Sequence, residues 1–321
     1  MDDLPAIGQT VAAGCNGISY TGGIMIIESR GLLADGLHAI GGPHLPAYLL
    51  IGETPVLFDA GMTFMGPAYR KDLQALLGDV GKLCCLYLTH AHFDHCGAGP
   101  YLKRNIPGLK IGAHRLAAET LRKTSAVELI RSLSRDCEEL YRDRVGREDI
   151  SFDSLDVDIP LEDEAEVDPG GGLAFRVIAT PGHTRDSVCY YIPRLKALIT
   201  GEAVGVFDRN FTIQPEFLAS YRDYVASLEK LLPLDLDLIM MSHYYTLTGE
   251  DARGYVARSL ERTKVFRERI ERYLDACGGD RDAVVRRIHR EDYLDTAANL
   301  QEERPYLINL QAKVRAVAEG K

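Results

Sequence analysis

The segment LCCLYLTHAHFDH, Leu83–His95, joins an apolar run to a dense cluster of metal-ligand residue types. The run LCCLYL has the composition of a strand that is buried on both faces. The cluster that follows holds three histidines and one aspartate within six positions: His90, His92, Asp94 and His95. Such side chains are costly to bury side by side unless a partner compensates them, and the usual partner is a metal ion. We therefore expect a metal site after this strand.

The spacing of the cluster suits two metal ions. His90 and His92 alternate along an extended segment, so their side chains can point in the same direction. Asp94 and His95 fall where the next helix begins and can turn toward a second point. Two metal ions about 3.5–4 Å apart would suit a bridging hydroxide as nucleophile. Four side chains are too few for two ions, so other segments must supply further ligands.

Three more candidate ligands follow apolar strands elsewhere in the chain. His183 follows the strand LAFRVIAT, Glu202 follows KALIT, and His243 follows LDLIMM. Because the carboxyl ends of neighbouring strands converge on one edge of a sheet, we expect these segments and the first cluster to form one shared site.

These motifs, in this order, resemble the metallo-β-lactamase fold superfamily. The matching segments are THAHFDH, TPGHT, TGE and SH, and the early LFDAG is also similar to that family. The resemblance covers most of residues 45–245 and implies an α/β fold, the metallo-β-lactamase αββα sandwich. It also implies two ligand groups, with His90, His92 and His183 on one metal ion and Asp94, His95 and His243 on the other.

The acidic residue of the TGE motif departs from the family pattern. The family usually has an aspartate at this bridging position, and this chain has Glu202. Glutamate is longer by one methylene group but keeps the carboxylate, so it can still bridge if the backbone lies further back. It could also bind a single ion, or make the two affinities unequal. We expect two divalent metal ions, and zinc, iron and manganese all suit such ligands.

Apolar periodicity predicts the elements around these motifs. Apolar runs predict strands at 46–52, 55–61, 83–89, 109–114, 173–180, 187–193, 196–201 and 236–242. Helical spacing predicts helices at 68–78, 97–108, 124–145 and 216–232, and the polar segment 162–172 is expected to be a loop.

The chain changes character after Thr248. A long amphipathic helix is predicted there, with Thr248 placed to cap it and Gly278 to end it, and two shorter helices follow at 280–289 and 300–318. We expect a catalytic domain over residues 1–248. Residues 249–321 are expected to form a helical C-terminal extension that covers the active site.

The composition of the chain limits which binding partners and which cellular location we expect. The 321 residues carry a formal net charge of −10, which disfavours nucleic acid and anionic membranes as partners. The segment MDDLPAIGQT lacks the features of a secretory signal, and no apolar run is long enough to cross a bilayer. Seven cysteines without a CxxC pair are typical of reduced thiols, so we expect a cytoplasmic protein with a small-molecule substrate. The sequence leaves open whether the protein forms a homodimer.

Several other residues have weaker links to the site. Asp59 could orient a ligand imidazole from behind, although a turn-forming aspartate explains it equally well. Tyr244 and Tyr245 could reach the substrate, with simple packing as the alternative. The arginines of the long helix are expected to pair with glutamates, with a phosphate site as the alternative. Ordinary structural roles are expected for Cys96, His38, His44, His114, His289, Thr184, Asp186 and Ser187.

A two-metal site of this kind suits hydrolysis, with Asp94 as the catalytic group that steadies the nucleophile or handles its proton. The segments THAHFDHCG, PYL and TSAVELIRSL, with the helical C-terminus, resemble one branch of the family. This branch contains the 2-aminobenzoylacetyl-CoA thioesterases, the response effectors of quinolone signalling. The resemblance implies an acyl-CoA substrate, so we expect a thioesterase.

Two alternatives stay open. The first is a lactonase or an enzyme similar to the hydroxyacylglutathione hydrolases. The second is a regulatory or scaffold protein in which the metal site is vestigial and the helical extension binds a partner. Hydrolysis rates on a panel of substrates would distinguish the first alternative from a thioesterase. The cellular effect of a ligand-site variant would distinguish the second alternative from an enzyme.

Overall fold

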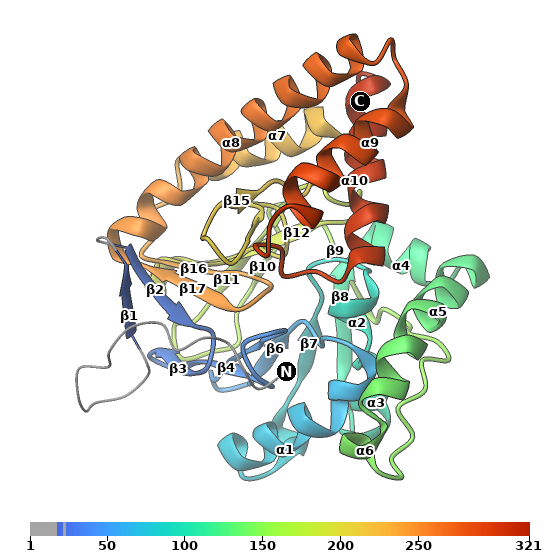
Figure 1. Cartoon of the computed structure of the whole chain (residues 1–321). Coiled ribbons are helices and arrows are strands. Elements are labelled where there is room, and N and C mark those ends of the chain that lie inside the picture. Colours follow the sequence, from blue (N-terminus) through green and yellow to red (C-terminus); the bar gives the residue numbers. More distant parts are fainter. Residues whose placement is uncertain (1–17, 22–23) are drawn as a thin grey trace.

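The structure, a computed structural model, describes residues 18–21 and 24–321, so the expectation about the segment MDDLPAIGQT lies outside the described residues. Two β-sheets pack face to face, and helices cover the outer face of each sheet (Figure 1). This arrangement confirms the predicted αββα sandwich. Within the described ranges, no helix combines the length and the apolar character that a membrane crossing requires.

The first sheet contains seven strands in chain order, among them the strand that leads into the histidine cluster. Its later strands are parallel, because helices connect them across the outer face. The strands are β3 (Gly31–Ala34), β4 (Leu37–Ile40), β5 (Ala47–Leu50), β6 (Val56–Phe58), β7 (Cys85–Tyr87), β8 (Lys110–His114) and β9 (Ile159–Leu161). The helices on this side are η1 (Thr63–Met65), α1 (Gly66–Leu77), η2 (Val80–Lys82), α2 (Phe93–Cys96), α3 (Gly99–Asn105), α4 (Arg115–Leu121), α5 (Thr124–Leu140) and α6 (Arg142–Val145).

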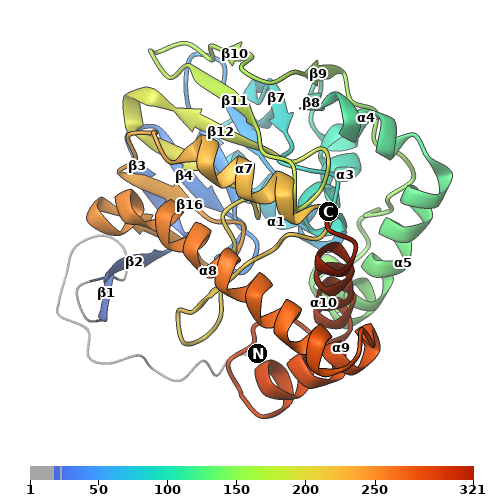
Figure 2. The same ribbon diagram turned by 90° about the horizontal axis from the view of Figure 1, so that it is seen from above.

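The second sheet carries the strands that lead to the other three candidate ligands. Its order is β1 (Ile18–Thr21), β2 (Ile24–Glu28), β17 (Tyr245–Thr248), β16 (Leu238–Met240), β13 (Ala197–Ile199), β12 (Val188–Ile192), β11 (Phe175–Ala179) and β10 (Glu166–Val167). The short strands β14 (Val206–Phe207) and β15 (Ile213–Gln214) form a separate hairpin, and η3 (Pro193–Leu195) follows β12. The helices on this side are α7 (Tyr221–Leu231), α8 (Gly249–Ala276), α9 (Arg281–His289), the π-helix η4 (Arg290–Leu294) and α10 (Glu303–Ala318), seen from above in Figure 2.

Three apolar layers hold this sandwich together. Between the sheets, the ring of Phe58 packs edge-on against Phe175 at 5.1 Å and lies 4.9 Å from the ring of Tyr190. One outer layer joins the first sheet to α1, α3, α4 and α5. The other outer layer contains residues of the second sheet and of α7, α8, α9 and α10, so the C-terminal helices share a core with the sheet that carries three candidate ligands.

Several predicted boundaries were wrong. The helix predicted at 216–232 begins only at Tyr221, because Ser220 is extended and its side chain caps the helix by accepting from Asp223 N. The helix predicted at 124–145 is interrupted at Tyr141 and continues as α6. The predicted loop 162–172 contains β10, and the short strands β3, β4 and β17 were not predicted.

Gly97 fixes how the histidine-bearing segment sits on the first sheet. Its amide donates to Gly61 O at 2.8 Å, and a Cβ there would lie 2.4 Å from Phe93 O and 2.7 Å from Gly61 O. We expect Gly97→Ala to lower the free energy of unfolding by about 3 kcal/mol, because backbone atoms cannot move away cheaply. Urea unfolding measures this effect. Gly254→Ala at a half-buried position of helix α8, where a Cβ meets only the end of Arg258, is the control and should stabilise by about 0.5–1 kcal/mol.

Candidate metal centre

The first four ligands follow β7 on a loop that Asp59 holds in place. Asp59 adopts a left-handed conformation with φ 59°, and its carboxylate accepts hydrogen bonds from Thr89 N at 2.8 Å and from Thr89 Oγ1 at 2.8 Å. His92 is the extended residue at the start of the short helix α2, which then carries Asp94 and His95. The turn between strand and helix therefore separates two pairs of ligands.

The other ligands lie after three strands of the second sheet. His183 follows β11, Glu202 follows β13, and His243 follows β16. The backbone at Gly201 has φ 51°, and a Cβ there would approach the Thr89 side chain to 3.0 Å. A glycine at this point lets Glu202 come close to the histidine loop.

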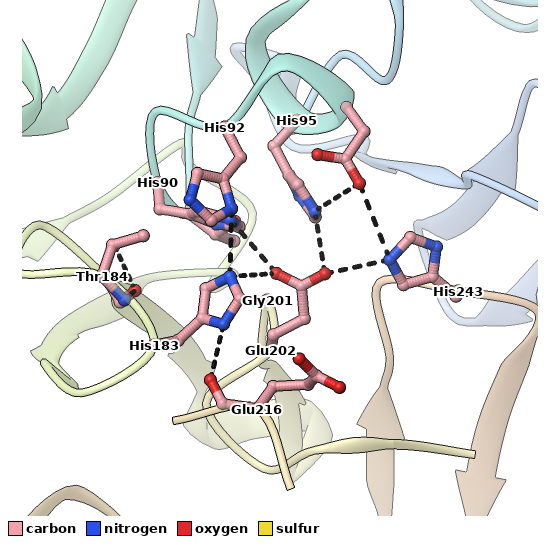
Figure 3. Close-up of polar contacts among 12 residues, drawn as sticks. His90, His92, His95, His183, Thr184, Gly201, Glu202, Glu216 and His243 are labelled. Carbon is pink, nitrogen blue, oxygen red and sulfur yellow. Dashed lines mark hydrogen bonds and ion pairs between the residues drawn. The ribbon is translucent and has the colours of Figure 1, made fainter. Parts of the chain in front are cut away.

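The structure brings all seven predicted ligand residues together (Figure 3). They form two groups in which the ligand atoms lie within 4.8 Å of one another, and both groups contain Glu202. The first group is His90, His92, His183 and Glu202, and the second is Asp94, His95, His243 and Glu202.

The two carboxylate oxygens of Glu202 divide between the two groups. Its Oε2 lies 2.9 Å from His183 Nε2 and 3.1 Å from His90 Nε2. Its Oε1 lies 3.0 Å from His243 Nε2 and 3.5 Å from His95 Nε2. This is the placement that a bridging carboxylate requires, so the longer glutamate side chain reaches both groups.

The ring nitrogens that point away from the centre have partners of their own. A bond from Nδ1 leaves Nε2 without its proton and able to bind a metal ion, so these partners set which nitrogen faces the centre. His92 differs, because its Nδ1 faces His183 Nε2 at 3.1 Å. The Nδ1 partners are Thr89 Oγ1 for His90 at 3.1 Å, Asp59 Oδ2 for His95 at 2.9 Å, Glu216 O for His183 at 2.7 Å and His44 O for His243 at 3.3 Å.

Buried polar atoms inside the centre test whether metal ions fit it. His90 Nε2, His95 Nε2 and Glu202 Oε2 are buried and have no hydrogen-bond partner in the described part of the chain. Glu202 Oε2 is within ion-pair distance of both His183 Nε2 and His90 Nε2, but neither contact has the geometry of a hydrogen bond. Unpartnered buried groups of this kind are rare and unfavourable. Divalent ions would satisfy all three atoms, and the imidazole and carboxylate donors suit zinc, iron or manganese.

The charge of Glu202 dominates the electrostatics of the metal-free centre. Burial is the largest single influence and lowers the pKa of His95, His183 and His243, but attraction to the neighbouring carboxylates, Glu202 foremost, together outweighs it and raises all three. Burial does prevail at His92, whose pKa falls to about 4. Despite its own burial, Glu202 has a pKa well below the usual range because of the surrounding histidines.

Metal binding is therefore expected to weaken as the pH falls, beginning above the ordinary histidine pKa of about 6.5. Protons and metal ions compete for the same ring nitrogens. A raised pKa means that His95, His183 and His243 already bind protons at a higher pH than an ordinary histidine does. Dialysis in steps from pH 8 to pH 5, with metal per chain measured at each step, checks this. A constant metal content down to pH 5 would contradict it.

Two residues near the centre have roles that the sequence did not indicate. Asp186, expected only to form a turn, accepts a hydrogen bond from Ala91 N at 2.8 Å and so ties the His90–His92 loop to the second sheet. His44, expected to be an ordinary loop residue, accepts from His243 through its carbonyl and pairs with Tyr244 Oη at 2.6 Å through Nδ1. No motif in the chain links Asp186 or His44 to its partner. Asp59 differs, because orienting a ligand imidazole was one of its two predicted roles, and its Oδ2 lies 2.9 Å from His95 Nδ1.

The two tyrosines that were expected near the substrate differ in their surroundings. Tyr244 has φ 62° and its hydroxyl contacts His44 beside His243, at the side of the centre where Asp94 and His243 are partly exposed. The ring of Tyr245 packs 5.3 Å from Phe211 and 6.1 Å from Phe207. Tyr245 therefore follows the packing alternative, and a substrate contact through Tyr244 stays a prediction.

The comparisons with known proteins agree with this geometry. The model of the metallo-beta-lactamase superfamily matches residues 42–243. A hydroxyacylglutathione hydrolase, GloC, from Haemophilus influenzae is 28% identical over 176 residues, which cover 54% of this chain and 74% of that protein.

Two solved structures are similar to this chain as a whole. An archaeal metallo-beta-lactamase superfamily protein from Sulfolobus tokodaii is 21% identical with a TM-score of 0.56, and the match covers 88% of this chain and 98% of that one. A metallo-beta-lactamase family protein from Thermus thermophilus is also 21% identical with a TM-score of 0.56, over 89% of this chain and 93% of that one. At this level of identity the two structures support the fold alone.

Proposed function

The chain belongs to the metallo-beta-lactamase superfamily, and from that premise we propose that it is a metal-dependent hydrolase that cleaves a thioester, such as an acyl-CoA. One observation carries the proposal. The two oxygens of Glu202 face two separate groups of ligand atoms, so the site has the residues for two ions that share a carboxylate. Paired ions of this kind serve hydrolytic chemistry.

Each part of the centre has a task in this reaction. When bound, two divalent ions would activate water at neutral pH and polarise the substrate carbonyl. The Asp94 side chain is 16% exposed while that of Glu202 is 7% exposed, so Asp94 faces the open side of the centre. We assign Asp94 to hold the attacking water and to accept its proton. The partners of the histidine Nδ1 atoms keep the rings in position while this happens.

Two observations support a thioester over the other substrates of the superfamily. The GloC relative is a hydroxyacylglutathione hydrolase, and a hydroxyacylglutathione is itself a thioester. The motifs and the helical C-terminus also resemble the acyl-CoA thioesterase branch. An acylglutathione is therefore the second candidate substrate, because the GloC relative favours it. The thiol half distinguishes the two candidates, since CoA carries a nucleotide and glutathione is a short peptide.

We further propose that the C-terminal extension covers the substrate at the centre. Arg304 of α10 pairs with Asp136 of α5 at 2.9 Å, and Ala298 O accepts from Arg209 N at 2.7 Å. The extension thus contacts α5 beside the first sheet and the β14–β15 hairpin that follows β13 of the second sheet. A cytoplasmic location completes the proposal, in keeping with the six unpaired cysteines of the described residues.

A hydrolysis panel on one purified sample tests the proposal. Metal per chain is measured first, and rates are then compared for acyl-CoA, S-hydroxyacylglutathione and lactone substrates before and after removal of metal by a chelator. We expect thioester turnover that falls at least a hundredfold on chelation and returns with added metal. Lactone turnover without thioester turnover would contradict the substrate class. Turnover of neither, in a metal-loaded protein, would favour the regulatory role.

A further inference from the structure

An ion pair between helix α10 and the segment that joins β15 to α7 is buried beside the metal centre. Lys313 of α10 has its Nζ 2.8 Å from Glu216 Oε1, and the two side chains are 8% and 3% exposed. The second oxygen, Glu216 Oε2, is buried without a hydrogen-bond partner among the described residues. Among the described residues, the side chain that pairs with the Glu216 carboxylate is that of Lys313. The charge of Glu216 therefore depends on Lys313 for compensation.

The peptide of Glu216 connects this ion pair to two ligands. Its carbonyl oxygen accepts the hydrogen bond from His183 Nδ1 at 2.7 Å (Figure 3), and this bond sets which nitrogen of His183 faces the centre. Its amide donates to Tyr224 Oη at 3.4 Å, and the same hydroxyl donates to Glu202 O at 3.0 Å. Glu216 therefore accepts a hydrogen bond directly from the ligand His183. It also contacts Tyr224, whose hydroxyl holds the backbone of the bridging Glu202.

We propose that Lys313 is a positioning residue for the metal centre, acting through Glu216 on His183. The ammonium group holds the buried carboxylate in place, and the carboxylate in turn keeps its own carbonyl on the His183 ring. Without the ammonium group the Glu216 side chain would be a buried charge without a partner, which is strongly unfavourable. It would move toward water and draw its peptide away from His183.

This inference assigns a role to the C-terminal extension that differs from covering the substrate. Helix α10, which packs on α7 and α8, would act on the metal centre through Lys313 and Glu216. The inference rests on the metal centre of the proposed function but not on the choice of thioester as substrate. Metal binding can therefore be measured whether or not the substrate is known.

The test measures zinc affinity of the full chain by competition with a chelating indicator, after the resident metal has been removed. We expect Lys313→Met to weaken binding of one zinc equivalent by about tenfold or more, the usual effect of losing a group that supports a ligand. Lys313→Arg, which keeps the charge, should stay within about threefold. The double variant K313M/E216Q leaves no buried charge and should recover to within about threefold, because the neutral side chain keeps its place.

Two further measurements distinguish a positioning role of Lys313 from a general effect of α10 on the packing of the fold. Leu310→Ala removes a buried side chain of the same helix without touching a charge, so it should lower thermal stability but leave zinc affinity unchanged. In the cobalt-substituted protein, K313M should shift the visible absorption bands that report on ligand geometry, and Leu310→Ala should not.

Three results would overturn the inference. One is a folded K313M that binds both zinc equivalents as the unmodified chain does. Another is a loss of affinity in Leu310→Ala that equals the loss in K313M. If K313M does not fold, the double variant decides. Its affinity must then remain within about threefold of the unmodified chain, and a tenfold loss would show that Lys313 does not act through the charge of Glu216.

Discussion

Replacing Asp94 with alanine is expected to lower kcat by about a thousandfold, with little change in the thermal stability of the metal-free protein. Asp94 Oδ2 lies 3.8 Å from His95 Nε2 and 3.9 Å from His243 Nε2, so the substitution removes a ligand of the second group. It also removes the carboxylate that faces the open side. The side chain is partly exposed and forms no part of an apolar layer, so the fold does not depend on it.

A matched variant isolates this effect. Asp143 lies, like Asp94, in the first turn of a four-residue helix, but it is exposed and belongs to neither ligand group. Asp143→Ala should keep full turnover and two metal ions. Steady-state rates, metal per chain and melting temperature are measured for both variants. His92→Ala, which removes a ligand of the first group, should behave as Asp94→Ala does. Turnover retained in either of these variants after loss of metal would contradict the mechanism.

Replacing Glu202 with alanine is expected to have the largest effect on metal content, because this residue is the one that both ligand groups share. The metal content should fall from about two ions per chain to below one, and kcat should fall by more than about a thousandfold. The loss should exceed that of Asp94→Ala in metal content, since Asp94 belongs to one group only. Metal analysis of the purified variant measures this directly.

Two conservative variants test why this chain has a glutamate. Glu202→Gln keeps the shape but removes the charge, so it should lose most of the metal. Glu202→Asp keeps the charge but shortens the reach, and it should retain more metal and activity than Glu202→Gln. Its metal content should still lie below that of the unmodified chain, since the distances on both sides fit the longer side chain. A Glu202→Ala variant that still holds two ions would show that Glu202 does not bridge.

Much of the fold followed from local patterns. Apolar runs such as LCCLYL marked the buried strands, and the glycine stops at Gly78 and Gly278 marked helix ends, where both residues have positive φ. Strands with partly exposed residues, such as β3 at the edge of the first sheet and β17 inside the second, left no such pattern, because fewer of their side chains are buried. The early start predicted for α7 was wrong because residues 216–220 bind His183 through their backbone instead of forming a helical turn.

The candidate ligands could be predicted because metal binding demands particular side chains at strand ends. Apart from Asp59, their supports could not, since any nearby acceptor can hold an imidazole nitrogen. His183 uses the carbonyl of Glu216 and His243 that of His44, and a backbone carbonyl exists at every residue. Lys313 was hidden for a similar reason. One lysine in an amphipathic helix looks like part of a solvated face, and only the packing of α10 shows that it is buried.

The ligands come from two sheets and extend from His90 to His243, almost half of the chain. A growing chain that leaves the ribosome therefore has no complete ligand group until β13 has joined the first cluster, and the second group waits for the residues after β16. Because contacts of such long sequence separation form late in folding, metal uptake follows assembly of the sandwich and cannot guide it. Once bound, the ions would cross-link the two sheets. The free energy of unfolding of the mature protein would then rise with the free metal concentration of its compartment.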